Sequence, residues 1–462
     1  MRVVIVTESF PPDVNGVAHC TMQTARHLAA RGHEPLVIAP ATAGATATSR
    51  SSGTPRRPPA ASDPARPSAA PVPYPDASGI PWEPPTGSDP ARPPASSTPY
   101  PGASGIPWEP PTGSDPARPP ASSTPYPGAS GTPDVFESAA PCPVVRVPSL
   151  PLPGYSQVRV ALPSRRLMAA LTAHRAELVH LAGPFVLGAR GMAAAARLGL
   201  PAVAVYQTDL AGYARTYLGA GENTAWRRMR AVHSAADRTL APSTAAVRDL
   251  TEHGVERVRL WPRGVDTVRF RPGLRDEALR HRLAPGGEKI IGYVGRLAPE
   301  KHVELLAGAC GLPGVRVVVV GDGPSGASLR AALPGAVFLG RRTGEDLARL
   351  FASLDMFVHT GPYETFCQTV QEAMASGVPV IAPAAGGPLD LVDHGRTGLL
   401  VPPHDADAVR AAVGALVADP ARAAAYGRAG RTMVEGRTWE AVGDQLLDHY
   451  DEVLRDRTAV AA

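Results

Sequence analysis

The sequence predicts an α/β protein built from two doubly wound parallel-sheet domains. Short Val- and Ile-rich runs alternate with helical segments along most of the chain, which is the pattern of parallel sheets covered by helices. The alternation starts at residues 2–6, is interrupted by residues 42–141, and restarts as a second, similar series at residue 289. The chain has 462 residues, of which 44% are hydrophobic, so it can form two cores of ordinary size.

The first series indicates an N-terminal domain made of residues 1–41 and 142–262. Its opening run, RVVIV, is followed by Thr7 and Glu8 and not by a small-residue cleavage site, which favours a buried strand over a signal peptide. The expected strands cover 2–6, 34–39, 144–147, 177–182, 202–206 and 238–241, and helical windows lie near 16–31, 164–173, 188–198 and 224–236.

The second series indicates a C-terminal domain over residues 273–438. We expect a hinge near residues 262–272, across which the two sheets face each other over a cleft. A last helix, over roughly 439–455, lies beyond the second sheet, and residues 439–462 are expected to pack back on the N-terminal domain. The strands of the second domain are expected at 289–295, 315–321, 336–340, 356–360 and 378–383.

Residues 42–141 form an insertion rich in Pro, Ala and Ser. The block at 74–99 recurs nearly verbatim from Tyr100 and begins again at Tyr126. Such repetition indicates a segment under little packing constraint, and the proline density favours extended, largely disordered chain. We interpret the insertion as a spacer; a docking segment anchored by Trp82 and Trp108 is the alternative.

Composition excludes several classes of protein. The formal net charge is only +4, so no global field indicates nucleic acid. The four cysteines, at 20, 142, 310 and 367, show no metal-binding or disulfide spacing, which favours a reducing cytoplasm. No window is long and apolar enough for a transmembrane segment, so any membrane contact would be peripheral. A basic helix that begins near Trp226 could touch a membrane surface, although a solvated face is favoured.

A strand followed by Gly295, Arg296 and Lys301 is the first candidate for phosphate binding. Lys289 and Lys301 are the only lysines of the sequence, so a lysine in this loop is less expected as incidental surface charge. A compact ammonium suits one phosphate oxygen, while a guanidinium can bind two oxygens at once. The alternative is a pair of solvated loop residues.

Two glutamates bracket the start of the next helical segment. Helical geometry would place Glu364 and Glu372 about 80° apart around the axis, so they would not share a proton. If Glu364 precedes the helix, it can reach a sugar above the N-terminus while Glu372 points to a ribose. The backbone amides of residues 365–367 would then face phosphates. The alternative gives both carboxylates ordinary helix roles.

Two motifs invite a wrong interpretation. The run GDGPSG at 321–326 fits a dinucleotide fingerprint, but it follows the second strand of its domain, and the next strand ends on Leu339 and Gly340 with no acidic residue for a ribose. Asp405 and Asp407 resemble a metal-binding pair, yet Asp405 follows a Pro-Pro turn and opens an Ala- and Val-rich helix, which indicates an N-cap.

The first domain offers polar residues at the ends of its strands. Asn15 and Gly16 lie between a strand and a helix, where the backbone can approach a ligand or simply turn. Gln207 and Asp209 follow a buried strand, the position where open α/β sheets bind ligands. His180 ends another strand and is interpreted equally as a core residue or a catalytic one.

These residues stand in motifs that resemble a known family. The segments GYVGRLAPEKH, GDGP, VFLG, PYETFCQTVQEAMASGVPVIAP and GGPLDLVDHGRTGLLVPP resemble those of retaining GT-B glycosyltransferases of family 4. HLAGPFVLGARG, YQTDLAGYARTY, LAPSTAAVRDL and RGVDTVRF are similar, more narrowly, to actinobacterial GDP-mannose-dependent α-mannosyltransferases that build glycolipids.

The resemblance implies two Rossmann-like domains that close over a nucleotide sugar without a metal or another cofactor. Carried over residue by residue, it makes Arg296, Lys301 and Glu364 the catalytic set. Donor binding would also involve Gly16, Gly295, Leu339, Thr365, Phe366, Cys367 and Glu372, and acceptor binding Asn15, Gly16, Gln207 and Asp209. Two positions depart from the family, because Cys367 replaces a small residue and Gln207 replaces a frequent histidine.

The expected function is transfer of a hexose, favouring mannose from GDP-mannose, to a membrane glycolipid or phosphatidylinositol-type acceptor. The enzyme would be cytoplasmic or peripheral at the inner face of the plasma membrane. Three alternatives remain: a UDP-sugar with a small soluble acceptor, a dinucleotide-dependent oxidoreductase, and a binding protein that has lost activity.

Overall fold

The computed structural model describes residues 1–13, 15–41, 140–152, 155–183, 185–209, 212 and 221–461. Apart from residues 140 and 141, the expected insertion at 42–141 lies outside the described residues, as do its repeats. No helix in the described part of the chain combines the length and the hydropathy that crossing a bilayer requires.

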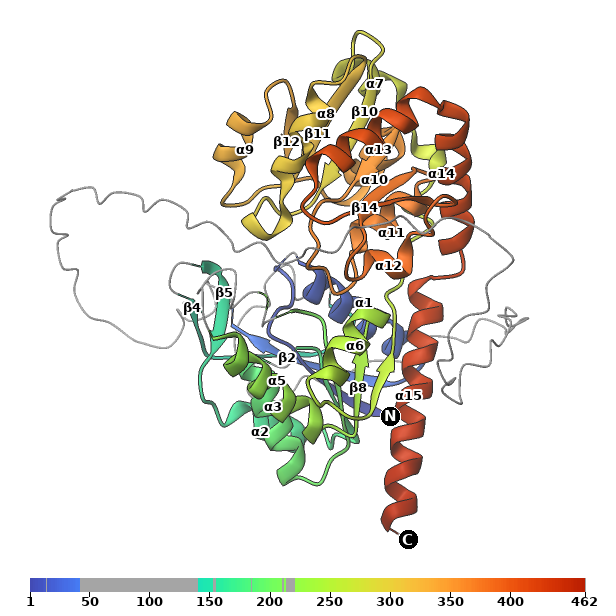
Figure 1. Cartoon of the computed structure of the whole chain (residues 1–462). Helices are drawn as coiled ribbons and strands as arrows, with labels where there is room; N and C mark the ends of the chain where they lie inside the picture. Colours follow the sequence, from blue (N-terminus) through green and yellow to red (C-terminus); the bar gives the residue numbers. More distant parts are fainter. Residues whose placement is uncertain are drawn as a thin grey trace, which may run out of the picture. The chain divides into compact units, whose positions relative to one another are not determined.

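The described elements alternate between strands and helices along the chain (Figure 1). The strands are β1 Arg2–Val6, β2 Glu34–Pro40, β3 Val144–Val147, β4 Ser149–Leu152, β5 Tyr155–Ala161, β6 Leu178–Leu181, β7 Ala202–Val205, β8 Arg238–Ala241, β9 Val258–Leu260, β10 Lys289–Val294, β11 Val315–Val320, β12 Val337–Gly340, β13 Met356–Val358, β14 Val380–Pro383 and β15 Gly398–Val401. The helices are α1 Gly16–Ala30, α2 Arg166–Ala173, α3 Val186–Arg197, α5 Glu222–Ala235, α6 Thr244–Glu252, α7 Glu277–Leu283, α8 Ala307–Cys310, α9 Gly326–Ala332, α10 Gly344–Ser353, α11 Gln368–Ala375, α12 Pro388–Leu391, α13 Ala406–Ala418, α14 Pro420–Val434 and α15 Trp439–Ala461, with 3-10 turns η1 Pro272–Leu274, η2 Pro299–Lys301 and η3 Val303–Leu306.

The first sheet is parallel throughout its described strands, in the order β3-β2-β1-β6-β7-β8-β9. Val4 of β1 lies opposite Leu36 on one side and Val179 on the other. The edge strand β9 was not predicted, because its sequence, VRL, is short and largely exposed. Strands β4 and β5 form a separate antiparallel pair that was also not predicted.

The second sheet is parallel as well, in the order β12-β11-β10-β13-β14-β15. Renumbered from its first strand, this is the 3-2-1-4-5-6 order of a doubly wound fold. The order reverses between β10 and β13, so the connections that follow these two strands leave the sheet side by side. The edge strand β15 was not predicted. The fold class predicted from the sequence is confirmed for both sheets.

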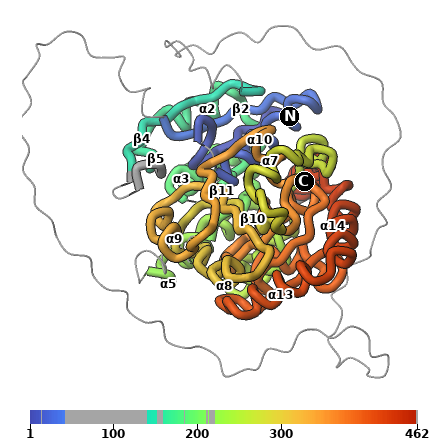
Figure 2. Tube along the Cα trace, turned by 90° about the horizontal axis from the view of Figure 1, so that it is seen from above, coloured from blue at the N-terminus to red at the C-terminus, as the bar shows by residue number. Residues whose placement is uncertain are grey.

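Alternate side chains of the second sheet enter two different cores. Val294, Val318 and Phe357 pack on one face with α7, α10 and α11, whereas Tyr293 and Val319 pack on the other with α8, α9 and α13. Seen from above, β10 and β11 lie between α7 and α10 on one side and α8 and α13 on the other (Figure 2). Burial on both faces explains the nearly continuous Val and Ile runs.

Helix α15 packs on the first sheet's helical layer, beside α1 (Figure 1). Its apolar residues Val442 and Leu446 join the core that contains Val3 and Ile5. Tyr450 Oη lies 2.7 Å from Nδ1 of His180. Complete burial lowers the pKa of His180 to about 3, so this histidine is a neutral core residue.

Candidate active site

The candidate site lies where the strand order of the second sheet reverses. The connection after β10 carries Gly295, Arg296 and Lys301, and the connection after β13 carries His359 and Glu364. Open α/β sheets bind their ligands outside the carboxyl ends of the strands at such a reversal. Two sequence segments about sixty residues apart therefore supply neighbouring side chains.

The glycine-rich run at 321–326 supports the first of these connections. Leu297 donates its amide hydrogen to Asp322 O at 2.8 Å and accepts one from Ser325 N at 2.9 Å. Gly321 has φ 143°, and a Cβ atom there would lie 1.8 Å from Gly295 O. Only glycine permits this backbone contact, so the motif that imitates a dinucleotide fingerprint holds the Arg296 loop in place.

Arg296 projects from this loop with a side chain that is 35% exposed. Its Nη1 lies 3.8 Å from Oε1 of Glu300, a buried carboxylate in the following turn. The guanidinium lies partly in solvent, where an anionic ligand can meet it.

Lys301 and Glu364, which the sequence analysis placed in separate motifs, are joined in the structure. Lys301 Nζ donates to Glu364 Oε1 at 2.5 Å, and the side chains are 17% and 20% exposed. Nε2 of His359 lies 3.2 Å from the same oxygen. The other carboxylate oxygen, Oε2, has no hydrogen-bond or ion-pair partner among the described residues. Glu364 thus offers one oriented oxygen to a ligand hydroxyl.

His359 was missed by the sequence analysis. It follows β13 and is 3% exposed, and its ring stacks parallel to Tyr293 at a centroid distance of 6.3 Å. Burial alone would lower its pKa, but Cys367 and Glu364 outweigh burial and raise the pKa of His359 to about 10. His359 could have been singled out as a histidine at the end of a predicted strand, as His180 was. Nothing in the sequence, however, links it to Glu364.

Two cations hold the Glu364 carboxyl group ionised. Burial alone would raise the pKa of Glu364, but Lys301 and His359 outweigh it and hold that pKa well below its ordinary range. A backbone hydrogen bond holds the loop that carries Glu364, because Gly387 N donates to Glu364 O at 2.8 Å. A Cβ atom at Gly387 would lie 2.2 Å from Phe366 O, so a larger residue there would displace the loop.

Helix α11 starts at Gln368, so Glu364 lies in the loop before it, as one of the two sequence interpretations proposed. Residues 365–367 also precede the helix, with Cys367 as the N-cap at φ 79°. The amides of Phe366 and Cys367 donate to no acceptor among the described residues. The Phe366 side chain is buried in the core, so only its backbone faces the site.

Glu372 lies on α11 and is partly buried. Desolvation raises the pKa of its carboxyl group to about 8, with Arg269 acting in the opposite sense and Asp266 in the same one. Leu339 lies at the end of β12, also partly buried, and is followed by Gly340 with φ 66°.

The expected acceptor residues Asn15 and Gly16 form the start of α1. Asn15 is its N-cap: its Oδ1 accepts from Ala18 N at 2.9 Å, and its Nδ2 donates to Ser9 Oγ at 2.7 Å. Gly16 is exposed, and its carbonyl accepts from Nη1 of Arg263 at 3.4 Å. A structural cap explains the asparagine, while the glycine leaves its backbone accessible.

Gln207 is engaged within the protein and is 6% exposed. Its Nε2 donates to Ala182 O at 2.8 Å, and its Oε1 accepts from Nη2 of Arg263 at 2.9 Å. The side chain therefore holds Arg263, another residue that the sequence analysis missed, beside Gly16. One carboxylate oxygen of Asp209, Oδ1, accepts a hydrogen bond from Gly212 N in its own loop at 2.8 Å.

Two hydrogen bonds link the segment around Glu364 and Glu372 to residues that follow strands of the first sheet. Thr365 Oγ1 donates to Gln207 O at 3.1 Å, and Gln371 Nε2 donates to Arg263 O at 3.1 Å. The loop and helix that carry the glutamates thus contact the backbone of the Gln207 and Arg263 segments.

Asp405, the predicted N-cap of α13, accepts from Ala408 N at 2.8 Å, which confirms that interpretation.

Comparison with known proteins agrees with this arrangement. Residues 275–433 match the family described as Glycosyl transferases group 1, and residues 126–269 match Glycosyltransferase Family 4. A protein of Mycolicibacterium smegmatis, named GDP-mannose-dependent alpha-mannosyltransferase, is 41% identical over the whole of both chains. The chain belongs to glycosyltransferase family 4. A protein of the same name from Mycobacterium tuberculosis is 50% identical over 69% of this chain and 84% of its own length.

Two solved structures share the fold of this family-4 member. HepE of Anabaena, solved in complex with UDP, superposes with a TM-score of 0.66 at 18% identity, covering 98% of this chain and all of that one. Sucrose-phosphate synthase from Thermosynechococcus elongatus gives 0.67 at 21% identity, with 99% and 100% covered. As a glycosyltransferase, the protein uses a nucleotide sugar and is not an oxidoreductase.

Proposed function

We propose that the protein transfers mannose from GDP-mannose to a hydroxyl group of a glycolipid or phosphatidylinositol-type acceptor, with retention of the anomeric configuration. One observation carries the proposal: Glu364, held by Lys301 and His359, presents a single unpaired oxygen next to the start of α11. The names of the relatives from Mycobacterium tuberculosis and Mycolicibacterium smegmatis support mannose and guanine as the donor's parts.

Side chains and backbone amides around the start of α11 would hold the sugar and the diphosphate of the donor. Oε2 of Glu364 accepts hydrogen bonds from mannose hydroxyls, while Arg296 and the amides of Phe366 and Cys367 bind the diphosphate. Lys301 neutralises charge between the carboxylate and the phosphates. Thr365, Gly16 and Gly295 contribute backbone or hydroxyl groups at the same end of the site.

The nucleoside end of the donor would lie further along the second sheet. Glu372 on α11 binds the ribose, and the backbone around Leu339, at the end of β12, borders the base. The partly buried Glu372 has the raised pKa of a desolvated carboxyl group, which suits a residue that exchanges hydrogen bonds with sugar hydroxyls.

The reaction breaks the bond between the mannose anomeric carbon and the phosphate oxygen as Arg296 and Lys301 take up the developing negative charge. The acceptor oxygen attacks the same face of the sugar and forms the new glycosidic bond. Its proton passes to a phosphate oxygen, and GDP leaves. Preorganised positive groups at the leaving group are the main source of acceleration in such a site.

Exposed side chains of the N-terminal part support a lipid acceptor. Leu150 of β4 and Leu162, just after β5, are 57% and 37% exposed, and Arg165 and Arg166 follow as exposed cations. Apolar side chains flanked by arginines suit the surface of an anionic bilayer. We therefore propose a cytoplasmic enzyme that acts at the inner face of the plasma membrane, with Asn15 and Asp209 near the acceptor.

Ligand-induced stabilisation tests the donor. GDP-mannose and GDP should raise the melting temperature of the purified chain in a concentration-dependent way, because both bind only the folded state. UDP-glucose and UDP-N-acetylglucosamine at the same concentrations should give a smaller shift. No shift with GDP or UDP at saturating concentration would overturn the proposal.

A soluble acceptor is the second candidate. Relatives named D-inositol 3-phosphate glycosyltransferase, one from Mycobacteroides abscessus at 32% identity over 62% of this chain, favour it. Transfer from GDP-mannose to lipid vesicles that contain phosphatidylinositol, compared with transfer to free inositol phosphate, decides between the two acceptors.

A further inference from the structure

His359, Glu364 and Cys367 form a compact cluster of ligand atoms. One atom of each, a ring nitrogen, a carboxylate oxygen and the thiol sulfur, lies within 4.8 Å of the other two. They come from the end of β13, the loop after it and the N-cap of α11. His359 and Cys367 are buried, and Glu364 is partly exposed, so the cluster opens toward solvent on the carboxylate side.

Within the cluster, His359 interacts with both other members, Cys367 and Glu364. Both ring nitrogens of His359 are buried without an aligned hydrogen bond, although Nε2 lies 3.2 Å from Glu364 Oε1. Thr369 Oγ1 lies 3.7 Å from the Cys367 sulfur, which is a long contact. Buried histidine nitrogens normally make well-aligned hydrogen bonds, so their poor alignment here leaves room for a better-placed partner.

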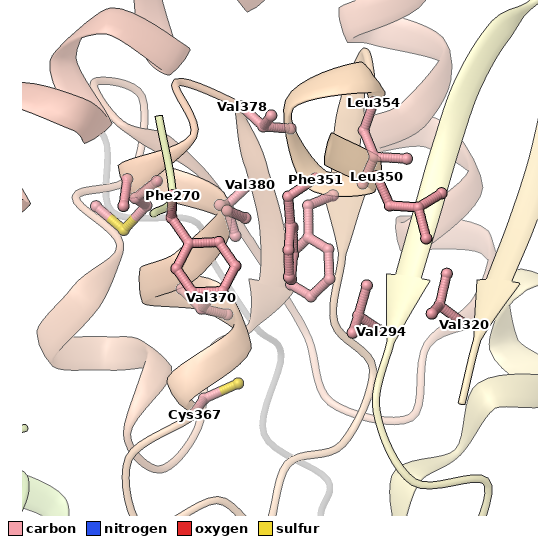
Figure 3. Close-up of a cluster of buried hydrophobic side chains, with 14 of the residues drawn as sticks. Phe270, Val294, Val320, Leu350, Phe351, Leu354, Cys367, Val370, Val378 and Val380 are labelled. Atoms are coloured by element: carbon pink, nitrogen blue, oxygen red, sulfur yellow. The ribbon is translucent and has the colours of Figure 1, made fainter. Parts of the chain in front are cut away.

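The backbone fixes the thiol in this position. Cys367 has φ 79°, a left-handed conformation that a residue with a side chain adopts only at a cost. Val370 and Phe270 pack beneath it, and Figure 3 shows Cys367 at the edge of this buried cluster, beside the start of the helix that carries Val370. The thiol therefore lies where the loop after β13 meets the start of α11.

We propose that His359, Glu364 and Cys367 bind a borderline-soft divalent cation of the Zn²⁺ class. A thiolate, an imidazole and a carboxylate are the three ligand types that Zn²⁺ takes, and three protein ligands leave a fourth position open. The sulfur disfavours Mg²⁺ and Ca²⁺, which prefer oxygen ligands. Binding displaces protons from the thiol and the imidazole to solvent.

Occupancy of this site would exclude the sugar donor, an inference that rests on the proposed function. The cation would take the Glu364 carboxylate that is assigned to the mannose hydroxyls, and it would lie at the α11 N-terminus where the diphosphate is assigned. The site would then act as an inhibitory one, in which Zn²⁺ and GDP-mannose compete.

Titration of the reduced full chain with Co²⁺ tests the site directly, because cobalt bound to a thiolate gives a charge-transfer band besides its visible bands. We expect the charge-transfer band to saturate at one equivalent and to be lost in Cys367→Ser and in His359→Gln. Cys310→Ser is the matched control: Cys310 ends α8, outside the cluster, and this variant should retain the band. Melting curves verify that each variant is folded.

Absence of the band, or a band that survives both Cys367→Ser and His359→Gln, would overturn the site. Addition of GDP-mannose should then displace Co²⁺ from the unaltered chain. A different outcome is that GDP-mannose raises the melting temperature and yet leaves the cobalt spectrum unchanged. That result would contradict competition between metal and donor but would leave the metal site itself supported. If GDP-mannose does not stabilise even the metal-free chain, the proposed function itself fails.

Discussion

Lys301 Nζ lies 2.5 Å from Oε1 of Glu364, and the two residues follow different strands of the second sheet. Their contact joins the connections after β10 and β13 at the reversal of strand order. Since His359 Nε2 approaches the same oxygen, both cations are on one side of the carboxylate. The other oxygen is thereby oriented toward a ligand.

Glu364→Gln should weaken binding of GDP-mannose but leave binding of GDP nearly unchanged. A hydrogen bond to a charged group contributes about 1.5–3 kcal/mol, so we expect a loss of roughly tenfold to a hundredfold in kcat/KM. Isothermal titration with GDP-mannose and with GDP separates the two effects. Equal weakening of both ligands would contradict a sugar-binding role and indicate general damage to the site.

Arg296→Ala should reduce turnover by about a hundredfold, the scale of losing one preorganised donor that stabilises developing charge. Its side chain is partly exposed, so the melting temperature should change little. Arg428→Ala, at an exposed position of α14, serves as the control for loss of one positive charge. Near-normal turnover in Arg296→Ala would remove the proposed role.

Gln207 and Arg263 should behave as one unit. Gln207→Ala leaves a buried guanidinium without its amide partner, and such a loss costs about 1–3 kcal/mol of unfolding free energy. Once Arg263→Ala is present, the added effect of Gln207→Ala should be smaller, so the double variant should lose less than the sum of the single ones. Urea unfolding of the four proteins measures this coupling. Strictly additive losses would show that Gln207 acts independently.

Glu372 should make the ligand-free protein less stable as pH rises. Its folded-state pKa of about 8 lies above the ordinary 4.5, so the folded chain binds the proton more tightly than the unfolded chain between these values. Stability from this group is therefore present below pH 4.5 and lost as pH rises toward 8. Glu372→Gln cannot ionise and should gain melting temperature relative to the unaltered protein from pH 5 to pH 8.5.

Exposed Glu256 provides the control for that comparison, since Glu256→Gln should shift the melting temperature equally at both pH values. A constant difference between Glu372→Gln and the unaltered chain across this range would mean that the carboxyl group is not desolvated. GDP-mannose should also bind Glu372→Gln more weakly, because a ribose partner is lost.

The sequence was sufficient for most of the fold because both sheets are buried on two faces. Strands such as β10 and β11 are continuous runs of Val and Ile, and these runs were predicted nearly to their ends. Strands β9 and β4 were missed because they are short and partly exposed, so their apolar patterning is weak, and β5 was missed together with its partner β4.

The site was predicted less completely, because its side chains meet only through the strand order. The sequence indicated Lys301 and Glu364 separately, but their contact requires β10 and β13 to be neighbours. His359 and Arg263 were not found, since a lone histidine after a strand and an arginine after a Pro carry no local signal of their partners. Gln207 was expected near the acceptor, and its link to Arg263 depends on packing that no spacing encodes.

The reversal of strand order between β10 and β13 also bears on how such an enzyme diversifies. On the proposed assignment, the connection after β10 supplies the cations that face the leaving group, and the connection after β13 supplies the carboxylate that binds the hexose. Exchange of residues 359–364 alone would alter the contact with the hexose and leave the proposed diphosphate contacts of Arg296, Phe366 and Cys367 in place. Donor preference can thus change in evolution through replacement of one short loop on an otherwise unchanged scaffold.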